Sequence, residues 1–210
     1  MCLASLLPSL VGNLLCLIEG KGAKTPPKVG YKHMSKKLFR IYIAVSLDGF
    51  IARANGAVDW LDQYDPAEFD FDSFLDTVGT LIIGRKTFDQ VMQFGDWPYE
   101  DCRTIVLTSR ELPKDRPANT EAYGGSIIEL VDQLRSNRAD DGDIWIVGGG
   151  SVVTQFLFGG FADQLDIFTV PEVLGQGISL FGQDAGGIKP KLLATERYNS
   201  GVVRSQYGLH

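Results

Sequence analysis

Short apolar runs recur along the chain, and most are followed by glycine or polar residues and then by apolar residues at helical spacing. The clearest case is the segment 144–157, in which an apolar run passes through Gly148, Gly149 and Gly150 and continues with the spacing of a helix. Such a segment predicts a buried strand, a tight turn and a helix. The same reasoning predicts further strands at 38–47, 80–83, 103–107 and 165–170.

Two helices and a final pair of strands complete the pattern. The tetrapeptide 65–68, Asp-Pro-Ala-Glu, has an N-cap residue, a proline at the first helical position and a glutamate at the third, so we predict a helix to about Thr77. The apolar positions of 127–134 fit one face of a helix. The segments 191–198 and 201–207 predict an antiparallel pair. Strands that alternate with helices and end in a hairpin indicate an α/β fold with a mostly parallel sheet.

Composition narrows the classes of function. A chain of 210 residues with 44% hydrophobic residues can bury one good core, and we expect a single domain over residues 36–210. The formal net charge of −6 and the lack of Lys and Arg clusters argue against nucleic acid as a partner. Three cysteines without a C-x-x-C pair and only two histidines exclude a disulfide framework, a metal centre and chemistry based on a central histidine.

The first residues do not fit this domain. The apolar run 1–18 is similar to a signal sequence, but it has no basic n-region and no clear cleavage site follows it. A segment rich in Gly, Lys and Pro leads to Met34, which lies just before the first convincing strand and is an alternative start. We therefore treat residues 1–35 as an extension that is irregular or not native. We expect a cytoplasmic protein without a membrane partner.

Three predicted strand ends carry residues that suit an anion. Gly148-Gly149-Gly150-Ser151 could cradle a phosphate with backbone N–H groups, although a glycine-rich turn without a ligand has the same pattern. Gly84-Arg85-Lys86-Thr87 adds two cations and a hydroxyl at a helix start, and Thr108-Ser109-Arg110 closes another strand. Because ligands of open α/β sheets bind at the carboxyl ends of the strands, the three could share one ligand with several phosphates.

In their order and spacing, five motifs resemble those of the dihydrofolate reductase superfamily. Within it, the sequence is most similar to the C-terminal reductase domain of bacterial riboflavin biosynthesis proteins and its stand-alone relatives. The resemblance covers roughly Lys37 to Tyr207 and implies a dihydrofolate-reductase-like single domain. The motifs are Ser46-Leu47-Asp48-Gly49-Phe50-Ile51-Ala52, Gly84-Arg85-Lys86-Thr87-Phe88, Thr108-Ser109-Arg110, Val147-Gly148-Gly149-Gly150, and Gly177 through Phe181.

The resemblance implies NADPH as cofactor. The turns at 85–87 and 148–151 would meet the pyrophosphate, and Ser109 and Arg110 would meet the adenosine 2′-phosphate, for which a bidentate guanidinium is well suited. Ala44 and Ile51 would border the nicotinamide. The complete set of cofactor-binding residues that the resemblance implies is Ala44, Ile51, Gly84, Arg85, Lys86, Thr87, Thr108, Ser109, Arg110, Val147, Gly148, Gly149, Gly150 and Ser151.

Carboxylates are the candidates for catalysis, because reduction of a C=N bond by hydride also needs a proton at nitrogen. By the resemblance, the donor lies early in the helix after the lid loop. Counting back from Gly84 gives Glu68, and counting forward from Trp60 gives Asp65. The alternative for Asp65 and Glu68 is a capping box, and the alternative for Asp48, a third candidate, is an ordinary Asp-Gly turn. Trp60 is either a lid residue over the substrate or an apolar anchor of its loop.

The resemblance implies an NADPH-dependent reductase of a small heterocyclic or imine-like substrate, similar to 5-amino-6-(5-phosphoribosylamino)uracil reductase. Dihydrofolate reductase is the alternative enzyme, and a non-catalytic NADPH-binding module is the alternative of another class. Two departures leave the substrate open. Cys102 stands near the position of the arginine that grips the folate carboxylate, and the D-D-P-x-L segment of the riboflavin enzymes is absent. Relatives are often dimers, so a homodimer is also an open expectation.

Overall fold

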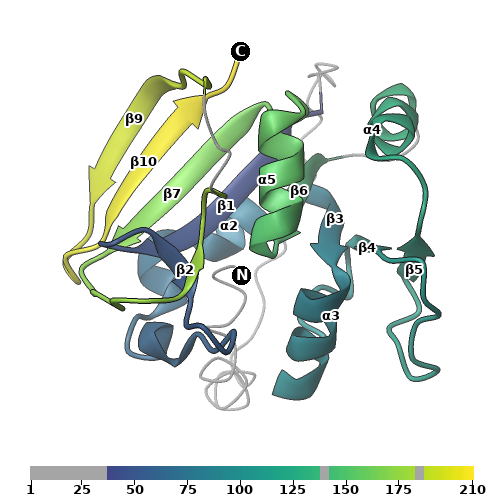
Figure 1. Cartoon of the computed structure of the whole chain (residues 1–210), viewed down its shortest axis with the longest axis horizontal. Coiled ribbons are helices and arrows are strands. Elements are labelled where there is room, and N and C mark those ends of the chain that lie inside the picture. The colour runs from purple at the N-terminus through teal and green to yellow at the C-terminus, as the bar shows by residue number, and fades with distance from the viewer. Residues whose placement is uncertain (1–36, 138–141, 183–186) are drawn as a thin grey trace, which may run out of the picture.

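The computed structural model describes residues 37–137, 142–182 and 187–210. Its centre is an eight-stranded sheet in the order β5-β4-β3-β6-β1-β7-β10-β9, which crosses Figure 1 from right to left. A separate small sheet pairs β2 with β8 in antiparallel fashion. The strands are β1 (Phe39–Ser46), β2 (Phe50–Ala52), β3 (Val78–Gly84), β4 (Arg103–Leu107), β5 (Thr120–Tyr123), β6 (Asp143–Gly148), β7 (Gln164–Val170), β8 (Ile178–Ser179), β9 (Lys191–Arg197) and β10 (Val203–Gly208).

The sheet is parallel from β5 to β7, and β10 is antiparallel to both β7 and β9. This arrangement confirms the predicted α/β fold with a C-terminal antiparallel hairpin. All strands predicted from apolar runs are present within a few residues of the expected bounds. Since the parallel strands point the same way, the polar residues that follow β3, β4 and β6 meet at one edge of the sheet.

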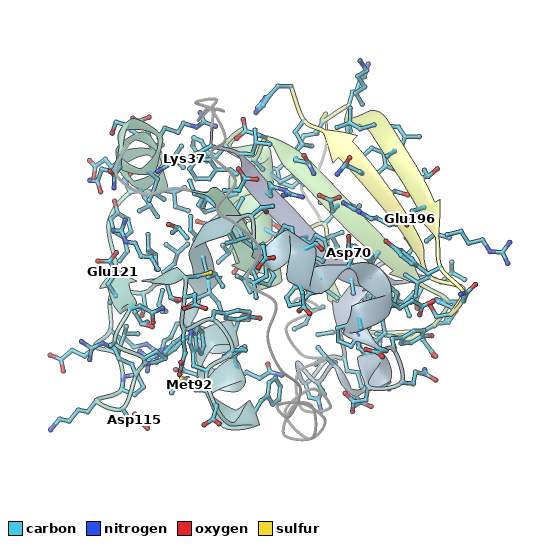
Figure 2. All side chains as sticks on the ribbon, turned by 180° about the vertical axis from the view of Figure 1, so that it is seen from behind. Lys37, Asp70, Met92, Asp115, Glu121 and Glu196 are labelled. Atoms are coloured by element: carbon cyan, nitrogen blue, oxygen red, sulfur yellow. The ribbon has the colours of Figure 1, made fainter. Side chains whose placement is uncertain are left out.

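β1 separates two cores, because successive side chains of a strand point to opposite faces. Ile41 and Ile43 belong to the core under α4 and α5, on the face seen in Figure 1, whereas Tyr42 and Ala44 belong to the core under the other helices. Figure 2 shows α2 crossing the sheet on that opposite face. The helical segments are η2 (Asp59–Leu61), η3 (Pro66–Phe69), α2 (Phe71–Leu75), α3 (Arg85–Val91), η4 (Met92–Phe94), α4 (Ile127–Ser136) and α5 (Gly150–Phe158).

None of the helices in the described ranges is long and apolar enough to cross a membrane.

The helix predicted from Asp65 to Thr77 is interrupted. Asp65 does cap its first turn, since its carboxylate accepts a hydrogen bond from the backbone N–H of Ala67 at 3.0 Å. However, this turn is the 3₁₀ helix η3, and α2 starts only after Asp70, whose φ of 55° is left-handed. A left-handed residue cannot continue a right-handed helix, so the single predicted helix is two short ones.

A buried charge network joins the hairpin to the parallel sheet. Asp166 on β7 is fully buried, and its Oδ1 accepts hydrogen bonds from Nε and Nη2 of Arg204 at 3.0 and 2.8 Å. The side-chain amides of Gln206 and Gln164 donate to the same carboxylate at 3.0 and 2.7 Å. Arg40 of β1 approaches its other oxygen at 3.7 Å. The network therefore ties together β1, β7 and β10 through one carboxylate.

Candidate functional site

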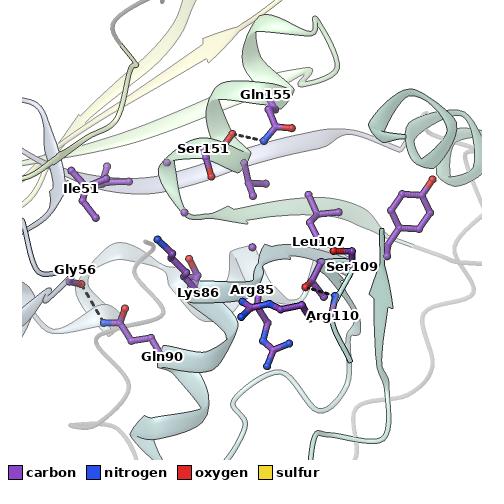
Figure 3. Close-up of a pocket in the computed structure, with 18 of the residues that line it drawn as sticks. Ile51, Gly56, Arg85, Lys86, Gln90, Leu107, Ser109, Arg110, Ser151 and Gln155 are labelled. Atoms are coloured by element: carbon purple, nitrogen blue, oxygen red, sulfur yellow. Dashed lines mark hydrogen bonds between the residues drawn. The ribbon is translucent and has the colours of Figure 1, made fainter. Parts of the chain in front are cut away.

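An elongated cavity of about 950 Å³ runs along the carboxyl edge of the sheet, between the start of α5 and the start of α3. Ile51 lies at one end, Ser109 and Arg110 lie at the other, and Lys86 points into the space between Ile51 and Ser151 (Figure 3). The cavity is large enough for a dinucleotide-sized ligand. It brings together most of the predicted cofactor residues: Ile51, Gly84, Arg85, Lys86, Thr87, Thr108, Ser109, Arg110, Gly149, Gly150 and Ser151.

The glycine turn after β6 is shaped by close contacts that leave no room for a side chain. A Cβ on Gly149 would lie 3.0 Å from Oγ1 of Thr87, and a Cβ on Gly150 would lie 3.2 Å from the carbonyl oxygen of Ser179. The peptide bond between Gly148 and Gly149 is cis. The backbone of this turn, at the N-terminus of α5, therefore borders the cavity directly, which is the geometry of an anion cradle.

Two of the three cations of the cavity are unpaired. Within the described part of the chain, the side chains of Lys86 and Arg110 make no hydrogen bond or ion pair, although both are exposed beside the cavity. Arg85 differs, because its Nε donates to Asp89 at 2.7 Å and its Nη1 donates to the carbonyl oxygen of Glu111 at 2.8 Å. The positive charge available to an anion thus comes chiefly from Lys86 and Arg110, and Asp89 on the same helix already neutralises Arg85.

The end of the cavity at Ile51 is apolar. Ile51 is 1% exposed, and Ile178 of β8 lines the wall next to it. Both side chains pack against the start of α5, since a Cβ on Gly150 would lie 3.3 Å from Cδ1 of Ile51 and 3.5 Å from Cγ2 of Ile178. The cavity is therefore divided into an apolar end and a cationic end.

Four predicted site residues lie outside the cavity wall. Ala44 and Val147 are buried in the core on the α2 face, at 1% and 0% exposure. Gly148 precedes the cradle without lining it. Trp60 in η2 is 4% exposed in the same core, and its indole N–H has no hydrogen-bond partner. As placed, Trp60 is an apolar anchor of its loop rather than a lid over the cavity.

The three candidate carboxylates also lie outside the cavity wall. Asp65 caps η3, and Glu68 accepts a hydrogen bond from the backbone N–H of Ser200, in the β9–β10 turn, at 3.0 Å. The predicted capping box is therefore only half formed, because Glu68 does not reach back to Asp65. Asp48 bonds to Ser46 and to the backbone N–H groups of Leu174 and Gly175.

Sequence reasoning missed part of the wall. Gly124 and Gly125 follow β5 as a glycine turn at a strand end, which is the same signal that revealed the other three turns, but β5 itself was not predicted. The turn lies tightly against Ser109, whose Cα would be 3.2 Å from a Cβ on Gly124. The other missed residues, which carried no recognisable motif, are Ala54, Asn55, Gly56, Gln90, Leu107, Tyr123, Ile127, Val152, Gln155 and Ile178.

The fold and the cavity define a dihydrofolate-reductase-like domain. Dihydrofolate reductase from Enterococcus faecalis, solved in complex with NADP(H), superposes with a TM-score of 0.60 at 21% identity, over 82% of this chain and 96% of that one. The bifunctional diaminohydroxyphosphoribosylaminopyrimidine deaminase/5-amino-6-(5-phosphoribosylamino)uracil reductase of Thermotoga maritima superposes with a TM-score of 0.64 at 18% identity, over 83% of this chain and 57% of that one.

The chain belongs to the RibD C-terminal domain family, whose model matches residues 39–204. The uncharacterized protein YyaP of Bacillus subtilis is 34% identical over 175 residues, which is 79% of this chain and 91% of that protein. The resemblance inferred from the five motifs is thereby confirmed. The domain is of the RibD reductase type.

Proposed function

We propose that the protein is an NADPH-dependent reductase that transfers hydride to a small heterocyclic or imine-like substrate, similar to 5-amino-6-(5-phosphoribosylamino)uracil reductase. The observation that carries the proposal is the single cavity in which the ends of β3, β4 and β6 meet. Its cradle has no room for a Cβ, and its cations Lys86 and Arg110 have no protein partner among the described residues. These features fit a ligand with separated phosphates.

Each part of the cavity has a role in this proposal. The backbone at Gly149 and Gly150, with Lys86, would hold the pyrophosphate, and Ser109 and Arg110 would hold the 2′-phosphate. Ile51 and Ile178 would pack against the nicotinamide and exclude water from it. When bound, NADPH would supply the hydride. The protein would add only orientation and charge neutralisation.

Activity with an added acceptor tests the proposal. We expect NADPH to be oxidised, as followed by the loss of nicotinamide absorbance, when the deaminated riboflavin pyrimidine or a related heterocycle is supplied. Dihydrofolate is the comparison substrate, and faster turnover with it would favour the alternative enzyme. Binding of NADPH without turnover of any acceptor would favour a non-catalytic binding module.

Lys86→Met tests the pyrophosphate site. Both NADPH and NADH carry the pyrophosphate, so we expect the variant to weaken the two cofactors equally, by about tenfold, which corresponds to one charge-assisted hydrogen bond. Titration of each cofactor by calorimetry gives the two dissociation constants. Lys114→Met, which removes an exposed lysine outside the cavity wall, is the matched control and should change neither constant. Unchanged binding in Lys86→Met would contradict the assignment.

The proton donor is tested by Asp65→Asn and Glu68→Gln. Because both carboxylates accept hydrogen bonds from backbone N–H groups and neither lines the cavity, we expect turnover to stay within about twofold of the wild type. We expect a small loss of stability instead, by about 1 kcal/mol for each. A tenfold or larger fall in turnover for either variant, with an unchanged melting temperature, would identify that residue as the donor.

A further inference from the structure

The carboxylate of Asp48 joins two segments that are far apart in the sequence. Its Oδ1 accepts hydrogen bonds from Oγ of Ser46 at 2.6 Å and from the N–H of Leu174 at 3.1 Å, and its Oδ2 accepts one from the N–H of Gly175 at 2.7 Å. The N–H of Leu47 also donates to the carbonyl oxygen of Glu172 at 2.7 Å. The turn between β1 and β2 is thereby fastened to the segment 171–175 that follows β7.

Ser46 makes this clasp specific. Its side chain is 1% exposed, and its hydroxyl both donates to Asp48 and accepts from the N–H of Phe50 at 3.0 Å. The hydroxyl thus holds the carboxylate in one orientation and fixes the first residue of β2. Gly175, whose φ is +72°, turns its N–H toward the carboxylate in a backbone conformation that favours glycine.

The fastened segment leads directly to the apolar wall of the cavity. After Gly175 the chain enters β8, which pairs with β2 through Phe50↔Ser179 and Ala52↔Ile178. β8 is only two residues long, and both are exposed. A strand this short is not stable by itself, so its position depends on what holds its ends. The clasp at Asp48 holds the N-terminal end, and the N–H of Leu180, which donates to the carbonyl oxygen of Gly49 at 3.1 Å, holds the other.

We propose that Asp48 is a positioning residue that holds β8, and with it Ile178, against Ile51 and Gly150 at the nicotinamide end of the cavity. This inference rests on the proposed use of NADPH. It assigns to Asp48 a role other than proton donation, because all three printed contacts of the carboxylate are with the clasp and Asp48 does not line the cavity. The hydroxyl of Ser46 and the N–H groups of Leu174 and Gly175 also hold the pKa of Asp48 below its ordinary value of 3.8, so the group is ionised at neutral pH.

The test compares NADPH with adenosine 2′,5′-bisphosphate, which has the adenosine half of the cofactor and no nicotinamide. We expect Asp48→Ala to weaken NADPH by about tenfold, because β8 loses the anchor of its N-terminal end. Adenosine 2′,5′-bisphosphate should bind the variant within about twofold of the wild type, because the cationic end of the cavity keeps all its contacts. Calorimetric titration gives both constants, and a thermal melt checks the fold.

Two further variants sharpen the test. Asp48→Asn keeps one acceptor oxygen but turns an NH₂ group toward a backbone N–H, so we expect an intermediate loss of NADPH affinity. This variant carries the test if Asp48→Ala does not fold. Asp132→Ala removes an exposed carboxylate on α4, outside the cavity wall, and should change neither ligand.

Each outcome is decisive. Selective weakening of NADPH in both Asp48 variants supports the inference. Equal weakening of both ligands, or no weakening of either, overturns it while leaving the proposed cofactor intact. Unchanged NADPH affinity with turnover lowered at least tenfold in Asp48→Asn would instead identify Asp48 as a proton donor. If the wild-type protein does not bind NADPH, the proposed function and this inference both fail.

Discussion

Asp166→Ala is expected to lower the free energy of unfolding by about 3 kcal/mol, which is the usual cost of removing one partner from a buried ion pair. The reason is that Arg204, Gln164 and Gln206 all donate to this one carboxylate, which is fully buried. Without it, a guanidinium whose side chain is only 24% exposed loses its main acceptor. Urea denaturation followed by circular dichroism measures the loss.

Glu196→Ala is the matched control for this prediction, because Glu196 approaches the same guanidinium, at 3.8 Å, but its side chain is 57% exposed. An exposed ion pair contributes little, so we expect a loss of less than about 1 kcal/mol. Equal effects of the two substitutions would show that burial of the Asp166 carboxylate does not set its contribution. The C-terminal hairpin would then be held by other contacts.

Arg110→Ala is expected to weaken NADPH by about 10- to 100-fold and to leave NADH within about twofold of the wild type. The two cofactors differ only in the 2′-phosphate, so the difference between their losses reports contact with that group alone. Arg110 suits this role because it lines the cationic end of the cavity beside Ser109 and its side chain has no partner within the described residues.

Arg116→Ala provides the control for Arg110→Ala. Arg116 belongs to the same connection between β4 and β5, but it does not line the cavity, and its Nε donates to the carbonyl oxygen of Thr120 at 3.3 Å. We expect unchanged affinity for both cofactors. An equal loss of NADPH and NADH affinity in Arg110→Ala would contradict the 2′-phosphate role and would point to the pyrophosphate instead.

The main strands and their ends could be predicted from the sequence because the information is local. Buried parallel strands are continuous apolar runs, and the turns that follow them need glycine, so both are visible in a few residues. β5, β2 and β8 carry too little of this signal. β5 has four residues, of which two are exposed, and β2 and β8 are paired only through the contacts around Gly49 and Ser46.

The partners of charged side chains were much less predictable. Glu68 bonds to Ser200, which lies 132 residues away, and no local pattern reports such a contact. Arg85 is different, since its partner Asp89 is four residues further along the same helix and the pairing could have been expected. The sequence therefore located the cavity through its backbone turns but did not show which of its charges are free.

The most direct test of the account is a titration of the purified wild-type protein with NADPH and with NADH, followed by heat or by nicotinamide fluorescence. It needs no knowledge of the substrate. We predict tight binding of NADPH and much weaker binding of NADH, because Arg110 and Ser109 would contact only the cofactor that carries the 2′-phosphate. Binding of neither would contradict the account, and the glycine turns around the cavity would then be structural features of the fold without a cofactor.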